Sequence, residues 1–164
     1  MDELSRIKIR LALEDLNTAF TYCLDHDRID ALVDLFTEDA LYTHGERRSQ
    51  GRGEVRALFE RRAAGGVRTC RHLSTGLRLD IESLTAARGT SVCLTFAFDG
   101  PAPVTPATPY LVADFLDVYR LCADGKWRIA VRQIHRIFVA ATNAGPVGAG
   151  SPASEPFIAA RNVP

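Results

Sequence analysis

The sequence lacks an excess of charge of either sign. Twenty lysine and arginine residues balance twenty aspartate and glutamate residues, so the formal net charge at pH 7 is zero. Nucleic acids and anionic membranes attract proteins through surplus positive charge, and a balanced chain offers neither of them a general electrostatic footprint. We therefore expect no nucleic acid and no membrane among its partners.

Long apolar runs are also missing, and we expect no leader segment. A helix that spans a bilayer needs about 20 consecutive apolar residues, and no stretch of the chain reaches that length. The N-terminal segment MDELSRIKIR contains two acids near its start and has no apolar core of the kind found in signal peptides. These features predict a cytoplasmic protein.

Cysteine is sparse and scattered along the chain. The four cysteines form no C-x-x-C motif, and no histidine stands at the spacing of a zinc ligand. Buried free thiols account for all of them, which are Cys23, Cys70, Cys93 and Cys122. We expect no metal and no cofactor.

The remaining 164-residue chain is long enough to bury one substantial core without disulfides or metals. Its composition changes near Ala140, beyond which Gly, Pro and Ala dominate. Such a composition favours a poorly structured tail. We therefore predict one domain over residues 1–140 and a Gly/Pro/Ala-rich tail over residues 141–164.

The first half of the domain carries helical patterns. Apolar residues recur every three to four positions from Ser5, and no Gly or Pro intervenes before His26, which predicts a long first helix. A charged corner follows, and the apolar stripe then resumes in a short second helix over residues 29–36. The run 40–44 is β-prone. A third helix is predicted over residues 54–64, where a glycine pair ends it.

The second half carries strand patterns. The Asp124-Gly125 pair predicts a hairpin, and four prolines within residues 101–109 predict a loop. Helices followed by antiparallel strands predict an α+β domain with helices on one face of a curved sheet. The predicted strands are Val67–Asp80, Thr90–Phe98, Tyr110–Cys122 and Trp127–Val139.

Several short motifs then occur in a characteristic order. They are Asp30-x-Leu32 with Leu35–Ala40, Gly51–Val55, Arg71-His72-Leu73 and Asp124–Ile129. Through them, residues 5–138 resemble the SnoaL-like branch of the nuclear-transport-factor-two-like superfamily. The resemblance implies a cystatin-like cone, in which a strongly curved antiparallel sheet and three N-terminal helices enclose a deep, mostly apolar pocket. Pockets of that kind bind small organic molecules.

Two residues match positions that are catalytic in part of this superfamily. Scytalone dehydratase, the bile-acid dehydratases and lindane dehydrochlorinase resemble the chain at Asp25 and His72. The resemblance implies that the His72 imidazole removes a proton from carbon while the Asp25 carboxylate holds its other nitrogen. It thus implies a cofactor-independent lyase of dehydratase type, which acts by β-elimination on a small apolar carbonyl or polycyclic compound.

Other interpretations of these residues stay open. His72 also suits a packed core, and Asp25 also suits the end of a helix. The tyrosines that assist the departing oxygen in the relatives fall on Phe20 and Leu24 here, so that role is unassigned. We expect Tyr22 and Tyr110 to line the pocket, where either could substitute.

The steroid Δ5-isomerases offer a second comparison. They place a general-base carboxylate where His44 stands and an acid that holds an oxyanion where Asp114 stands. The alternation of the strand puts Asp114 among apolar neighbours, a setting that favours a neutral, hydrogen-bond-donating carboxyl group. The phenol of those enzymes falls on Phe20, which argues against a steroid isomerase. We expect His44 and Asp114 to line the pocket as polar groups.

A non-catalytic alternative comes from the β-subunits of aromatic-ring-hydroxylating dioxygenases. The chain resembles them at Arg71-His72-Leu73 and at Gly125–Ala130, and His72 would then be structural in a scaffold or ligand-binding subunit. A stand-alone enzyme should instead form a closed homo-oligomer, and we expect a homodimer or homotrimer. The basic pairs Arg47-Arg48 and Arg61-Arg62 are interpreted as solvated surface.

Overall fold

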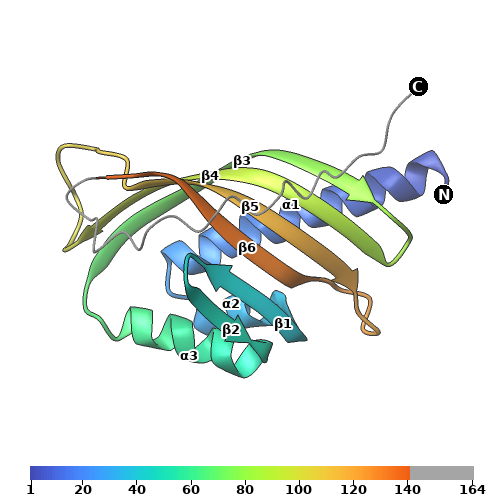
Figure 1. Ribbon diagram of the computed structural model, residues 1–164, viewed down its shortest axis with the longest axis horizontal. Coiled ribbons are helices and arrows are strands. Elements are labelled where there is room, and N and C mark those ends of the chain that lie inside the picture. Colours follow the sequence, from blue (N-terminus) through green and yellow to red (C-terminus); the bar gives the residue numbers. More distant parts are fainter. Residues whose placement is uncertain (141–164) are drawn as a thin grey trace.

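Helices come first and long strands last along residues 1–140, which are the residues that the computed structural model describes (Figure 1). The predicted tail over residues 141–164 lies outside them. No helix within the described range is both long and apolar enough to cross a membrane. The elements are α1 (Glu3–Asp25), α2 (Ile29–Asp34), β1 (Phe36–His44), β2 (Arg47–Gln50), α3 (Gly51–Ala63), β3 (Arg68–Ile81), β4 (Ala86–Asp99), β5 (Leu111–Leu121) and β6 (Trp127–Val139).

The long first helix starts at a capped N-terminus. The Asp2 carboxylate accepts a hydrogen bond from the backbone N–H of Ser5 at 2.9 Å, which satisfies one of the free donors of the first turn. Its apolar stripe is buried, and the buried apolar residues are Ile9, Leu13, Leu16, Phe20, Cys23 and Leu24. The helix ends at Asp25, and Asp27 then takes a positive φ of 49° that turns the chain into α2.

The six strands form one sheet in the order β2-β1-β6-β5-β4-β3. The predicted antiparallel pairing is confirmed for β3 to β6, whereas β1 runs parallel to β6. Periodicity does not encode the partner of a strand, and the α2 corner delivers β1 in the same direction as β6. The β2 strand was not predicted because its sequence, RRSQ, has no β-prone residues.

The helices cover one side of this curved sheet, as the α+β prediction requires (Figure 1). In Figure 1, α1 crosses behind the long strands while α3 lies beside β1 and β2. Aromatic rings fill the space between the layers: Phe20 meets Phe36 and Phe115 edge to face, with ring centroids 6.0 and 6.3 Å apart. Along β5 alternate side chains are buried, so one face of the strand points into the core.

A buried polar cluster joins α1 to the sheet inside this core. Arg132 and Asp117 are fully buried and form an ion pair at 2.8 Å. Asn17 accepts a hydrogen bond from Arg132 at 2.5 Å and donates one to the Tyr119 hydroxyl at 2.9 Å. The Tyr119 hydroxyl in turn donates to Asp117 at 2.6 Å. The Arg132 guanidinium also lies 4.2 Å from the centre of the Phe20 ring.

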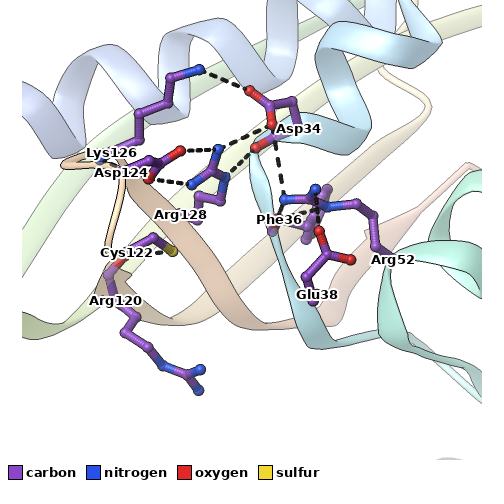
Figure 2. A network of polar contacts seen from close by, with 9 residues as sticks. All are labelled: Asp34, Phe36, Glu38, Arg52, Arg120, Cys122, Asp124, Lys126 and Arg128. Atoms are coloured by element: carbon purple, nitrogen blue, oxygen red, sulfur yellow. Dashed lines mark hydrogen bonds and ion pairs between the residues drawn. The ribbon is translucent and has the colours of Figure 1, made fainter.

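A second polar network closes the end of the molecule at the β5–β6 hairpin (Figure 2). The Arg128 guanidinium donates to both carboxylate oxygens of Asp124 at 2.8 Å, to the Asp34 carbonyl at 2.8 Å and to its carboxylate at 3.1 Å. Lys126 reaches Asp34 at 3.3 Å, and Arg52 donates to the Phe36 carbonyl. These contacts fasten the hairpin to the junction between α2 and β1.

Candidate active site

The helices and the sheet enclose a cavity of about 800 Å³. Its mouth is bordered by the segment between α3 and β3 and by the ends of β4 and β5, which lie at the same end of the molecule in Figure 1. Its inner wall is mainly apolar and aromatic. The lining residues are Phe20, Leu24, Tyr42, His44, Arg47, Leu58, Phe59, Arg61, Arg62, Gly65, Gly66, Arg68, His72, Thr95, Ala97, Asp99, Tyr110, Leu111, Phe115 and Ile134.

Asp25 and His72, which are 47 positions apart in the sequence, meet at this cavity. The Asp25 Oδ1 atom accepts a hydrogen bond from His72 Nδ1 at 2.5 Å, and Oδ2 accepts one from the His72 backbone N–H at 2.9 Å. The side chains are 5% and 13% exposed, respectively. A carboxylate at Nδ1 requires the proton there, so Nε2 carries a free lone pair. The side chain that lines the cavity can therefore act as a base.

The Asp25 carboxylate stays ionised in this setting. Burial raises its pKa, but the hydrogen bonds and charge of His72 outweigh burial, and the pKa falls below its ordinary value of 3.8. An ionised Asp25 fixes the ring tautomer and stabilises the imidazolium that forms when His72 accepts a proton. Burial meanwhile raises the pKa of the neighbouring Cys70 thiol, which keeps it neutral.

These residues could also be considered as metal ligands. The donor atoms of Asp25, Cys70 and His72 lie within 4.8 Å of one another. However, both Asp25 oxygens already accept N–H groups of His72, and the Nδ1 atom that faces the carboxylate is protonated. The Arg62 guanidinium adds a positive charge 3.0 Å from the Cys70 sulfur. The donor set thus suits a hydrogen-bonded pair better than a cation.

The structure places two more predicted residues, His44 and Tyr110, at the cavity. The His44 Nε2 atom is buried without a hydrogen-bond partner among the described residues. Burial, together with the positive charges of Arg136 and Arg47, lowers the pKa of His44 to about 4. His44 is therefore neutral near pH 7. Tyr110 lies at the mouth, where the Arg68 guanidinium is 5.6 Å from the centre of its ring.

Tyr22 and Asp114 lie away from the cavity, which corrects the prediction that both line it. Tyr22 is 55% exposed on the outer side of α1, where its ring stacks on His26 with centroids 4.3 Å apart. Asp114 lies on the face of β5 opposite the buried residues, in register with Val92 and His135. The strand alternation was correct, but it does not tell which of the two faces points inward.

Sequence reasoning missed the arginines and the tyrosine of the cavity wall. Arg47 and Arg61 are exposed, as the interpretation as solvated surface requires, but both also border the cavity together with Arg62 and Arg68. Tyr42 is buried and lines the same space. The alternation of Ala40, Tyr42 and His44 along β1 was the one available signal, because it puts Tyr42 on the face of His44.

Comparisons with known proteins agree with this architecture. Residues 5–133 match the family described as the SnoaL-like domain. No curated protein sequence matches the chain.

Among solved structures, a scytalone dehydratase-like protein from Novosphingobium aromaticivorans has a TM-score of 0.73 at 20% identity, covering 83% of this chain and 89% of that one. LinA has a TM-score of 0.70 at 24% identity, with 84% and 92% covered. A protein from Catenulispora acidiphila in complex with S-DNPA has a TM-score of 0.69 at 20% identity, with 79% and 94% covered. Likenesses at this level of identity show the shared fold.

Proposed function

The chain belongs to the SnoaL-like family, and from this premise we propose that it is a cofactor-independent lyase of dehydratase type. The observation that carries the proposal is the Asp25–His72 hydrogen bond of 2.5 Å at the wall of the cavity. A base held in one tautomer beside an apolar space suits proton abstraction from a carbon next to a carbonyl group.

The reaction balances with the groups at the site. His72 Nε2 takes a proton from the carbon, and the electron pair of that C–H bond forms a carbon–carbon double bond as the C–O bond at the neighbouring carbon breaks. The departing hydroxide takes a proton and leaves as water. Asp25 remains ionised throughout and stabilises the imidazolium. His72 then returns its proton to solvent, and the group that protonated the hydroxide takes up a proton from solvent, which restores the site.

Tyr42 is our candidate for the donor to the departing oxygen. It lines the cavity, and its hydroxyl forms no hydrogen bond with any residue of the described part of the chain. Burial raises the pKa of Tyr42 to about 12, so the group is protonated at neutral pH. Donation to hydroxide is still downhill, because water has a pKa of about 15.7.

The base can be tested without knowing the natural substrate. The probe 5-nitrobenzisoxazole loses a proton from carbon to a base and opens to a coloured phenolate, so the step is followed by absorbance. We expect the wild-type protein to accelerate this elimination, and His72→Ala to lose about 10²–10⁴-fold in rate. Asp25→Asn should lower the rate, because an amide no longer holds the His72 ring in the tautomer that leaves Nε2 free to accept a proton. Tyr42→Phe should lose about 3- to 10-fold, the worth of one hydrogen bond to the developing phenolate.

His26→Ala is the matched control, because His26 is exposed at the corner beside Asp25 and does not line the cavity. It should react like the wild type. Equal rates for wild type and His72→Ala would contradict the catalytic proposal. Ligand binding without any elimination would favour the second candidate, a ligand-binding subunit of the dioxygenase β-subunit kind, which the enclosed cavity also suits.

A further inference from the structure

We propose that the substrate of this site carries an anionic oxygen group, such as a carboxylate, sulfate or phosphate, which the arginines at the cavity mouth bind. The inference rests on the proposed function and narrows its substrate class. Four arginines line the cavity, namely Arg47, Arg61, Arg62 and Arg68, against a single acidic lining residue, Asp99. A small apolar compound would offer these guanidinium groups no negatively charged partner.

Two of these arginines are already bound within the protein. The Arg68 guanidinium pairs with the Asp99 carboxylate across the β3–β4 pair. The Arg62 guanidinium donates to the Leu24 carbonyl and to the Cys70 sulfur, both at 3.0 Å, and lies 3.5 Å from Asp27. These contacts hold the two side chains at the cavity wall and balance their charges.

The positive charges of the other two arginines, Arg47 and Arg61, are not balanced by an acidic partner within the described residues. Arg47 and Arg61 are exposed at the mouth of the cavity and make no hydrogen bond and no ion pair with any residue in the range 1–140. They approach the cavity from different elements, Arg47 from β2 and Arg61 from the last turn of α3. Two guanidinium groups that face one space from separate elements suit an oxyanion, since each can donate a pair of parallel N–H bonds.

His44, which lies near these arginines, does not change the positive charge of the cavity mouth. His44 is neutral near pH 7 because burial and the charges of Arg136 and Arg47 oppose its protonation. It therefore adds no positive charge, although its ring lines the cavity together with the arginines. The inner half of the cavity, by contrast, is formed by rings and aliphatic groups such as Phe20, Phe115 and Ile134. The site thus divides into an apolar interior and a cationic mouth.

The geometry sets the size of the ligand. Arg68, which stays paired with Asp99, marks the depth of the mouth along β3. It lies four residues from His72 on the same face of the strand, which corresponds to about 13 Å between their backbones at about 3.3 Å per residue. Long arginine side chains shorten that span. We therefore expect an elongated apolar molecule on the order of 10 Å long, with the acidic C–H group at His72 and the anionic group at the mouth.

A pair of fluorescent probes separates the anionic group from the apolar body. The probe 8-anilinonaphthalene-1-sulfonate carries a sulfonate, and N-phenyl-1-naphthylamine has the same rings without it. In fluorescence titrations we expect the wild type to bind the sulfonate about ten-fold more tightly than the neutral probe, and salt to weaken only the sulfonate complex. Arg61→Met should weaken the sulfonate about ten-fold, and Arg47→Met/Arg61→Met further, with the neutral probe unchanged.

Arg78→Met is the matched control, because Arg78 is an exposed arginine of β3 that does not border the cavity. It removes the same net charge and should leave both probes bound as in the wild type. Equal affinities of the two probes for the wild type would overturn the proposal, as would equal weakening by Arg61→Met and Arg78→Met. His72→Ala should retain sulfonate binding, so a failure of the catalytic proposal is read separately from a failure of this one.

Discussion

Two histidines share the cavity, and their surroundings give them opposite roles. His72 touches a carboxylate that favours its protonated form during a reaction, whereas His44 has an unsatisfied, buried Nε2 atom and positive neighbours. The same residue type can thus be a base at one position and a group that is neutral near pH 7 at another. His44 is neutral because burial, and then the nearby positive charges, oppose its protonation, whereas His72 has a carboxylate as its neighbour.

The low pKa of His44 makes a pH-dependent contribution to stability. The folded value is about 4, while an unfolded chain has the ordinary value of 6.5. Between these values the unfolded chain binds more protons, so the free energy of unfolding rises with pH through this window and is constant above it. At about 1.36 kcal/mol per pKa unit, the contribution is at most about 3 kcal/mol.

We expect His44→Phe to remove much of this dependence. Urea unfolding at pH 4.5, 5.5 and 7.5 should show a smaller loss of stability toward acid for the variant than for the wild type. His26→Phe serves as the comparison, because that histidine is exposed. If His44→Phe and the wild type lose equal stability between pH 7.5 and 4.5, His44 does not titrate as inferred.

At the scale of elements, a backbone hydrogen bond and a polar side-chain network meet where β1 joins the sheet. Its partner β6 runs parallel to it, and the backbone N–H of Ile129 donates to the Leu35 carbonyl at 2.8 Å where the two meet. The Arg128 network of Figure 2 surrounds this junction and links the hairpin aspartate, Asp124, to Asp34 at the end of α2. The side chain of Arg128 is 8% exposed, so the network lies mostly out of solvent.

Arg128→Lys should therefore destabilise the fold. Lysine keeps the charge but lacks the planar fork that donates to Asp124 and Asp34 together, and hydrogen bonds to charged groups contribute about 1.5–3 kcal/mol. Urea unfolding measures the change. Arg120→Lys is the control, since Arg120 pairs with Asp39 in solvent and should change stability by less than about 1 kcal/mol. Similar losses in the two variants would mean that the network contributes no more than a surface pair.

Across the whole molecule, the candidate active site and the polar network that joins the β5–β6 hairpin to α2 lie in different regions. The cavity is lined at its mouth by the segment between α3 and β3, whereas the Arg128 network of Figure 2 lies at the β5–β6 hairpin. The buried Arg132–Asp117 pair holds α1 on the sheet through Asn17. Because Phe20 packs on the Arg132 guanidinium and also lines the cavity, this cluster supports the cavity floor.

Asp117→Asn should cost about 3–5 kcal/mol, because it leaves the Arg132 charge buried without a counter-charge. The double variant Asp117→Leu/Arg132→Met removes both charges and should recover most of that loss. Thermal and urea unfolding of the single and double variants give the comparison. A single variant as stable as the wild type would show that the pair is not charged in the folded protein.

The sequence by itself determined the type of nearly every element, because periodicity and turn residues act locally. The order and spacing of short motifs were enough to identify the family and to select Asp25 and His72 as partners. The oligomeric state and the cellular location of the protein stay predictions. The β2 strand escaped detection because pairing, not propensity, makes RRSQ a strand.

Only the tertiary structure decided which side of each element faces the cavity. It excluded Tyr22 and Asp114, brought in Tyr42, and placed Arg47, Arg61 and Arg62 at the border of the cavity. The physical reason is that alternation and helical spacing divide residues into faces without saying which face is inside. That assignment depends on the packing of α1 and α3 against the curved sheet, which brings together residues far apart in the chain.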